Sequence, residues 1–429
     1  MHEQTLVEKI LLRKSGAPIL PQSEYFHVPV DLVLGHDATI ALLIARFRKM
    51  GFKIWDPNRC FFAADHFAPP STPERADILN QFLTFVKEQS VSQDLLFKGI
   101  SHQLLIEDQR CQPGMFICGA DSHTVMAGAL GAFAIGLGST DILAVLLTGK
   151  TILAIPETIR VNFEGKLPSW LYGKDLALEI IRQVGEGGAV DRVFEYHDSQ
   201  SQLPMDGRLT ISNMSVEAGA TAGIFVPDRI LREYLETRDS SLPSEDGFLL
   251  PDRGAQYCQE LAICLDKIPP LVALPGGLTQ IVPAGDTKGQ AVDQVYIGSC
   301  AGGRLQDLEI TARLLKGRKV APGVRLVITP ASQKIYSECL ANGIFQTLAD
   351  SGAMITNSSC GACGGIDKGL IGAKEVCVSS SNRNFRGRMG SPDGLIFLSS
   401  PLTAAAAALT GHLGDPRDVS MIQERQHEN

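Results

Sequence analysis

Two cysteines three positions apart, Cys360 and Cys363, lie in a stretch rich in glycine and small polar residues, ITNSSCGACGGIDKG (355–369). A pair at this spacing can form a redox disulfide, hold half of a zinc site or bind part of an iron–sulfur cluster, or it can be two small core residues in a turn. A third thiol, Cys300, ends the apolar run QVYIGSC (294–300). Ligand sites of open α/β sheets lie at the carboxyl ends of strands, so we expect Cys300 to face a crevice.

Three thiols are one fewer than the four that a closed zinc site or a fully ligated cluster requires. A [4Fe–4S] cube held by three thiolates keeps one iron open, and that iron can act as a Lewis acid. Zinc is the competing interpretation, but a catalytic zinc more often has histidine or carboxylate ligands, and no H-x-E or H-E-x-x-H motif lies nearby. We expect most other cysteines to be buried core thiols, among them Cys258, Cys264, Cys339 and Cys377.

Polar turns in the first third of the chain carry imidazole and carboxylate groups suited to proton transfer. AADHFAPP contains Asp65 and His66, GISHQLL contains His102, and CGADSHT contains Asp121, Ser122 and His123. A single residue of this kind is more often structural than functional, but three histidines and two aspartates together favour a shared role. A carboxylate beside a histidine can keep the ring protonated or in one tautomer, as general acid–base catalysis requires.

Two further segments carry groups that bind carboxylates or water. SSSNRNFRGRMGSPDG contains Asn382, Arg383 and Arg388, and a guanidinium group binds a carboxylate bidentately. Such a run is often a solvated loop, but its place shortly after the cysteine pair favours a pocket rim. TISNMSVEAGAT contains Asn213 and Glu217, which are predicted to share one helical face. The glycine-rich GALGAFAIGLGS has no clean G-x-G-x-x-G between a strand and a helix, which argues against a dinucleotide site.

The bulk composition is that of an ordinary globular protein and excludes several classes of function. The 429 residues are 44% hydrophobic and 20% charged, and the net charge of −8 provides no basic surface for nucleic acid. No apolar run is long enough to span a membrane. The N-terminal segment reads as an amphipathic helix without the features of a signal peptide, so a cytoplasmic location is expected.

Short apolar strands alternate with helical patterns, which predicts an α/β fold with largely parallel sheets. Strands are predicted at 294–300, 324–330 and 394–400. Helices are predicted at 305–317, 331–352 and 401–411, the last with proline near its start and glycine at its end. Composition shifts near 155–160 and 266–290 predict three domains, at 1–158, 159–285 and 286–429.

Taken together, the motifs resemble the aconitase superfamily, in its isopropylmalate dehydratase and homoaconitase large-subunit branch. The resemblance extends along most of the chain, through DLVLGHDAT, DHF, GISHQ, GADSHT, GALGAFAIGLGSTD, TISNMSVEAGAT, IGSC, CGACGG and SNRNFRGRMG. It implies three α/β domains around a central [4Fe–4S] cluster with one open iron. It also implies reversible removal and addition of water on a hydroxy-di- or tricarboxylic acid.

The resemblance also implies roles for particular residues. The cluster would be held by Cys300, Cys360 and Cys363. Five residues would orient the hydroxyl and water and help to protonate the departing hydroxide, namely Asp65, His66, His102, Asp121 and His123. Glu217 would manage the water, and substrate or cluster would be contacted by Ser122, Asn213, Asn382, Arg383 and Arg388.

The implied reaction is the interconversion of 2-isopropylmalate and 3-isopropylmalate in leucine biosynthesis. Dehydration of homoaconitate or of a substituted malate, such as dimethylmalate or methylmalate, is the alternative, and a non-catalytic iron-sensing or RNA-binding relative is the alternative of another class. The expected partner is a separate small subunit carrying the swivelling fourth domain. The chain departs from the family pattern at Ala301, Gly302 and Ala362, beside the cysteines, and the effect is a changed environment for the iron.

Overall fold

The computed structural model describes residues 3–16, 25–238 and 248–419. The chain divides into two compact units, each assembled from several segments. Unit 1 comprises Met1–Leu96, Ser101–Glu164 and Gly187–Ile263, and unit 2 comprises Phe97–Ile100, Gly165–Glu186 and Cys264–Asn429. Within the described residues, no helix combines the length and apolar character needed to cross a lipid bilayer.

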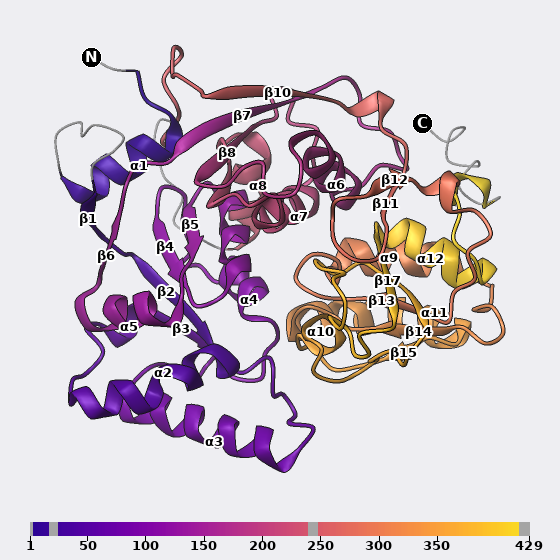
Figure 1. Cartoon of the computed structure of the whole chain (residues 1–429), viewed down its shortest axis with the longest axis horizontal. Coiled ribbons are helices and arrows are strands. Elements are labelled where there is room, and N and C mark those ends of the chain that lie inside the picture. The colour runs from indigo at the N-terminus through magenta and orange to yellow at the C-terminus, as the bar shows by residue number, and fades with distance from the viewer. Residues whose placement is uncertain (1–2, 17–24, 239–247, 420–429) are drawn as a thin grey trace. The chain divides into compact units, whose positions relative to one another are not determined.

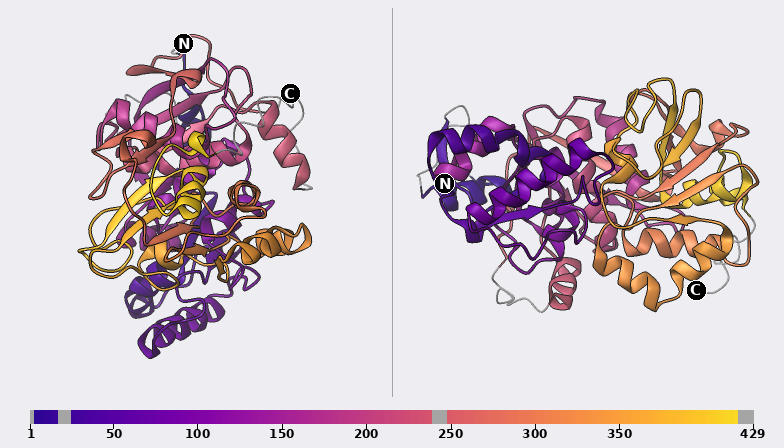
Figure 2. Two further views of the ribbon diagram at one scale, coloured as in Figure 1. Left: turned by 90° about the vertical axis from the view of Figure 1, so that its right-hand side faces the viewer. Right: turned by 90° about the horizontal axis from the view of Figure 1, so that it is seen from below.

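The first sheet of unit 1 is parallel, with strand order β3-β2-β4-β5. Its strands are β2 (Leu32–His36), β3 (Cys60–Ala63), β4 (Phe116–Gly119) and β5 (Phe133–Gly136). Nearly every residue in them is buried, as is typical of strands in a covered parallel sheet. Its helices are α2 (Asp37–Met50) and α3 (Pro73–Glu88), which lie side by side (Figures 1 and 2), and α4 (Ser101–Glu107) and α5 (Ser139–Thr148).

A second sheet of unit 1 has the order β10-β7-β8-β9. It is formed by β7 (Glu157–Glu164), β8 (Arg192–His197), β9 (Ala222–Phe225) and β10 (Gln259–Cys264). Its helices are α7 (Met205–Met214) and α8 (Arg229–Thr237), and β1 (Phe26–Pro29) pairs separately with β6 (Lys150–Leu153). The expected N-terminal helix is α1 (Leu6–Ser15), which begins with a capping box between Thr5 and Glu8.

Unit 2 contains a seven-stranded sheet with the order β12-β11-β17-β16-β13-β14-β15. The strands are β11 (Leu271–Ala273), β12 (Ile281–Pro283), β13 (Gln294–Ile297), β14 (Arg325–Ile328), β15 (Met354–Ile355), β16 (Val376–Ser379) and β17 (Leu395–Ser399). Pairing from β17 to β15 is parallel, so the carboxyl ends of these five strands lie at one edge. The helices are α6 (Gly173–Val184), α9 (Leu305–Leu315), α10 (Gln333–Ala341), α11 (Ile344–Ser351) and α12 (Pro401–Thr410) (Figure 1).

The α/β class, the largely parallel pairing and the three strands predicted in the last third of the chain are confirmed. The single helix predicted at 331–352 is wrong, because the chain forms α10 and α11 instead. The break falls at Gly343, whose φ of 70° lies in the left-handed region that glycine adopts without strain. The division into three domains stays a prediction.

Candidate functional site

A buried turn in unit 1 joins Asp65 to His66 directly after β3. Nδ1 of His66 lies 2.6 Å from Oδ1 of Asp65, and the main-chain N–H of Ser101 donates to the other oxygen of Asp65 at 2.7 Å. Asp37 supports the same turn by accepting the main-chain N–H groups of Asp65, His66 and Phe67 at 3.4, 3.1 and 2.7 Å. Both carboxylates are fully buried, and these hydrogen bonds compensate for their lost hydration.

Asp121 is the centre of a second set of contacts in unit 1. One of its oxygens, Oδ1, lies 3.2 Å from Nε2 of His102 and 3.3 Å from Nδ1 of His123, and it accepts the His123 main-chain N–H at 2.8 Å. Nε2 of His123 lies 3.0 Å from Oε1 of Glu217. The structure therefore brings together all six of the predicted catalytic residues, because His36 lies between this set and the Asp65–His66 pair.

His36 connects the two sets, although it was not among the site residues predicted from the sequence. Its ring stacks on that of His66, with centroids 4.0 Å apart and planes at 9°. Its Nε2 lies 3.6 Å from Oδ2 of Asp121, and its Nδ1 lies 3.9 Å from Oδ1 of Asp65. The signal was available, since His36 ends β2 and Asp37 follows it at the carboxyl edge of a parallel sheet, where the same rule placed Cys300.

The order of the strands explains why residues far apart in the sequence contact one another here. β2 pairs in parallel with both β3 and β4, with His36 opposite Ala63 and Leu34 opposite Gly119. The segments that follow the three strands therefore emerge at one edge. His102 comes from α4, and His123 from the 3₁₀ helix η2 (Ser122–Leu130), which Asp121 caps.

Charges within this network determine the protonation of its members. Burial alone disfavours the charged forms, but His66 and His36 hold the pKa of the Asp65 carboxyl below its usual range. Burial lowers the pKa of His66, but the negative charges of Asp65, Asp37 and Asp121 outweigh this effect and raise the pKa to about 9. His102 and His123 keep the pKa of Asp121 well below its ordinary value despite burial. Near neutral pH, a protonated His66 therefore lies beside ionised carboxylates.

His36, Asp37, Asp65 and His66 also place one donor atom each within 4.8 Å of one another, an arrangement that could hold a metal ion. Their carboxylates, however, already accept main-chain N–H groups and contact the imidazole rings. Asp37, Asp65 and His66 are therefore held by hydrogen bonds and opposite charges, whereas neither ring nitrogen of buried His36 has a hydrogen-bond partner among the described residues. We interpret the set as part of an acid–base network.

The remaining predicted residues of unit 1 lie on neighbouring elements. Asn213 is fully buried on α7, where its Nδ2 lies 3.4 Å from Sδ of Met126. Ser122 is the half-buried first residue of η2. Glu217 lies on the 3₁₀ helix η3 (Ser215–Ala218), which continues directly from α7. Asn213 and Glu217 both contact residues of η2, namely Met126 and His123.

In unit 2, Asn382 brings two of the predicted sulfur ligands together. Its Oδ1 lies 3.9 Å from Sγ of Cys300 and 3.6 Å from Sγ of Cys363. Cys300 follows β13 after Ser299, whose φ of 77° is unusual for a residue other than glycine. Cys360 and Cys363 lie around the 3₁₀ turn η7 (Gly361–Gly364) after β15, and Asn382 follows β16. All three segments leave the carboxyl edge of the sheet, as predicted for Cys300.

The thiols are chemically suited to hold a metal group. Cys300 and Cys363 are buried and Cys360 is half-buried. The backbone of the cysteine turn packs closely on the arginine segment, since a Cβ at Gly365 would lie 2.8 Å from the carbonyl oxygen of Arg388. Three thiols lie in loops at one edge of the sheet, and glycine lets the backbones of neighbouring loops pack closely. Thiolates are the usual ligands of iron–sulfur clusters, so these residues fit such a cluster.

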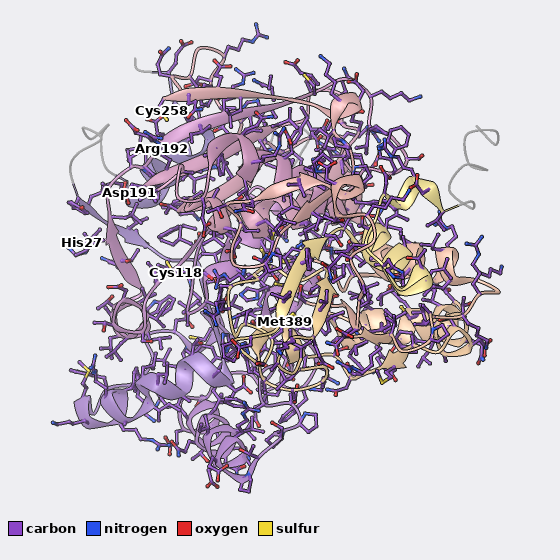
Figure 3. All side chains as sticks on the ribbon, turned by 45° about the vertical axis from the view of Figure 1, so that its right-hand side comes forward. His27, Cys118, Asp191, Arg192, Cys258 and Met389 are labelled. Atoms are coloured by element: carbon purple, nitrogen blue, oxygen red, sulfur yellow. The ribbon has the colours of Figure 1, made fainter. Side chains whose placement is uncertain are left out.

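The expected burial of the other cysteines is confirmed only in part. Cys339 and Cys377 are buried, and Cys377 lies within β16 as predicted for a core residue. Cys258 is exposed and Cys264 is half-buried, so that prediction is wrong for these two. Cys258, labelled in Figure 3, directly precedes β10, and Cys264 ends that strand. β10 lies at the edge of its sheet, and an edge strand has fewer neighbours to cover its side chains.

The arginine segment follows Asn382 and has both half-buried and exposed members. Arg383 and Arg388 are half-buried, and the Arg388 guanidinium lies 5.6 Å from the centroid of the Phe385 ring. Arg386 is exposed and pairs with Asp393 at 3.0 Å. The arginines of this segment therefore differ in exposure, and its place at the rim of a pocket stays a prediction.

Comparison with known proteins now decides the family. The profile of the aconitase family (aconitate hydratase) matches residues 8–411. The chain belongs to the aconitase family. The resemblance read from the motifs is therefore confirmed.

Named relatives within the aconitase family match almost from end to end. The chain is 42% identical to 3-isopropylmalate dehydratase large subunit 1 of Archaeoglobus fulgidus, over 97% of this chain and 99% of the relative. It is 42% identical to the 3-isopropylmalate dehydratase large subunit of Wolinella succinogenes, over 97% and 100%. It is 39% identical to the homoaconitase large subunit of Thermus thermophilus, over 97% and 98%.

One departure from the aconitase family pattern has a structural explanation. A Cβ at Gly302 would overlap the side chain of Ser380, whose hydroxyl donates to the carbonyl oxygens of Gly298 and Gly302 at 3.3 and 3.1 Å. Glycine at 302 therefore makes room for a serine that ties the Cys300 loop to the end of β16. Nothing in the structure explains Ala362 in place of proline.

Proposed function

We propose that the chain is the large, cluster-binding subunit of a hydro-lyase that interconverts 2-isopropylmalate and 3-isopropylmalate in leucine biosynthesis. The observation that carries this proposal is identity of 38–42% to large subunits named for that reaction, along nearly the whole chain. The acid–base network of unit 1 supports it, because dehydration of a hydroxy acid needs a proton donor for the departing hydroxide.

The proposed cofactor is one [4Fe–4S] cluster held by Cys300, Cys360 and Cys363. When bound, it supplies a Lewis-acidic iron that makes hydroxide a better leaving group. The contacts of Asn382 with two of the sulfurs support this assignment. Zinc is the less suitable alternative, because catalytic zinc sites more often include imidazole or carboxylate ligands.

The protonated His66 is the proposed acid, and Asp65 keeps it charged and fixes its ring. Asp121 orients His102 and His123, and Glu217 contacts the distal nitrogen of His123, where a carboxylate can accept a proton from water or substrate. Ser122 and Asn213 are proposed to donate hydrogen bonds. Asn382, Arg383 and Arg388 are proposed to bind the cluster or the substrate carboxylates.

The proposed partner is a separate small subunit that carries the swivelling fourth domain. Support comes from the names of the relatives, which are large subunits. We also propose a cytoplasmic location. Homoaconitate is the second candidate substrate, favoured by relatives of 39% and 41% identity that are named homoaconitase and probable methanogen homoaconitase large subunits.

The test begins with anaerobic reconstitution of the purified chain with iron and sulfide. Four irons per chain and a visible charge-transfer band are expected. The reconstituted chain is then combined with the small subunit from the same organism and given 3-isopropylmalate, homoaconitate or a methylmalate, and the unsaturated product is followed by its ultraviolet absorbance. Turnover of 3-isopropylmalate above the others is expected. A stable cluster with no turnover of any acid would contradict the hydro-lyase proposal and favour the iron-sensing alternative.

A further inference from the structure

Tyr296, on β13 in unit 2, is a fully buried tyrosine whose hydroxyl lies between the two loops that carry the predicted sulfur ligands. A Cβ built at Gly298, two residues before Cys300, would lie 2.7 Å from the phenol oxygen. A Cβ built at Gly361, in the cysteine turn at 360–364, would lie 3.4 Å from the same oxygen. Glycine at 298 therefore leaves room for a hydroxyl that touches the backbones of both loops.

The proton of this hydroxyl needs an acceptor. Burial raises the pKa of Tyr296 well above its usual range, so the phenol stays protonated and is a donor. Among the residues that the structure describes, none accepts from it with normal hydrogen-bond geometry. Thr329 and the main-chain N–H of Cys363 lower its pKa, as groups that donate to a phenolate do, and the Thr329 hydroxyl already pairs with that of Thr356 at 2.8 Å.

Packing alone does not explain a hydroxyl at this position. Phenylalanine would fill the same space, whereas a buried O–H without an acceptor destabilises the protein, and a buried tyrosine usually has a partner for its hydroxyl. The contacts with Gly298 and Gly361 leave the sulfur ligands of the two loops as the nearby candidates for an acceptor. A thiolate or sulfide that binds iron can accept such a hydrogen bond.

The neighbouring side chains divide the two loops between two donors. Ala301 and Gly302, which follow Cys300, have no side-chain donor to offer. Asn382 serves the Cys300 side, since its Nδ2 lies 3.8 Å from the Cys300 sulfur. The Tyr296 hydroxyl, in contact with the backbone of Gly361, is in position to serve the cysteine turn.

We propose that the Tyr296 hydroxyl donates a hydrogen bond to a sulfur of the cysteine turn when the cluster is bound, and thereby raises the reduction potential of the cluster and slows its loss of iron. This inference rests on the proposal above that Cys300, Cys360 and Cys363 hold a cluster. A hydrogen bond to a ligand sulfur withdraws negative charge, so it stabilises the reduced form and makes the potential more positive.

The test compares reconstituted full-length chains that differ only in this hydroxyl. Tyr296→Phe should shift the reduction potential to more negative values and release iron to a chelator roughly tenfold faster, as expected for the loss of a hydrogen bond to a charged group. In resonance Raman spectra, transfer of the wild type into deuterated water should shift the iron–sulfur bands, and the variant should lose part of that shift. Replacement of Tyr296 by 3-fluorotyrosine, a stronger donor, should make the potential more positive.

Urea unfolding of the cluster-free chain distinguishes a donor to the cluster from a simple tether between the two loops. Without the cluster the hydroxyl lacks an acceptor, so Tyr296→Phe should unfold at the same urea concentration as the wild type or at a higher one. Tyr196→Phe is the matched control, because Tyr196 is also buried in a strand but its hydroxyl lies 2.7 Å from Oγ of Ser215. The control should unfold at a lower urea concentration and keep the wild-type reduction potential.

The outcomes separate the inference from the proposed function. Failure of the wild type to take up iron and sulfide would overturn both. A normal cluster in the wild type, with unchanged potential and iron release in Tyr296→Phe, would overturn the role of Tyr296 alone, and a loss of stability in the cluster-free variant would then identify the hydroxyl as a tether. Should Tyr296→Phe fail to fold, the 3-fluorotyrosine protein decides, since a positive shift supports the inference and an unchanged potential refutes it.

Discussion

The ring of His36 lies parallel to that of His66, with centroids 4.0 Å apart and an interplanar angle of 9°. His36 also approaches Asp121, at 3.6 Å from Nε2 to Oδ2. It therefore connects the Asp65–His66 pair to the Asp121 set.

His66→Gln should remove a pH-dependent part of the stability. The pKa of His66 is raised from 6.5 to about 9 in the folded protein, so its stabilisation is complete below about pH 6.5 and is lost as the pH rises through about 9. The whole contribution is on the order of 3 kcal/mol. Urea unfolding of the wild type and the variant at pH 6, 8 and 10 measures it. Equal losses of stability in both proteins over this range would contradict the assignment.

Asp37→Asn should destabilise the turn that carries the proposed acid. The carboxylate of Asp37 accepts three main-chain N–H groups. The amide of asparagine has only one acceptor oxygen, so its NH₂ group, a donor, would face at least one of these donors. We expect a loss of about 1–3 kcal/mol in the free energy of unfolding, together with reduced turnover. The exposed Asp141→Asn is the control and should change stability by less than about 0.5 kcal/mol. A similarly small effect at Asp37 would show that the turn is held by other contacts.

Cys300→Ala and Cys363→Ala should abolish stable binding of the cluster. Each variant leaves two of the three proposed sulfur ligands, and iron and sulfide content after reconstitution should fall to a small fraction of the wild-type value. Cys377→Ala is the matched control, because it removes a buried thiol from a strand of the same sheet. Full iron content in either of the first two variants would refute the ligand assignment.

Arg383→Lys should weaken binding of the substrate more than it slows turnover. Lysine keeps the charge but cannot bind a carboxylate through two parallel hydrogen bonds, so KM should rise by roughly tenfold, equivalent to about 1.4 kcal/mol. Arg386→Lys is the control, since Arg386 is exposed and pairs with Asp393. The assay requires the reconstituted complex with its small subunit. An identical rise in KM for both variants would point to a general effect of the loop.

Local sequence patterns predicted elements well where a segment is governed by its own periodicity. The strand that became β13 and the helix that became α12 were found because their apolar runs and flanking proline and glycine act locally. The wrong predictions came where the outcome depended on one helix-breaking residue or on the position of a strand in its sheet. The helix pattern at 331–352 contained a glycine that ends one helix and begins another, and the burial of Cys258 depended on which strand lies at a sheet edge.

For this protein, the sequence alone determined the types of reactive groups, the α/β class and, through its motifs, the family. The tertiary structure decided which groups contact one another. It placed His36 against His66 and made Asp121 a shared partner of two imidazoles. The physical reason is that these contacts depend on strand order and on the edge at which each strand ends, and no short stretch of sequence specifies either.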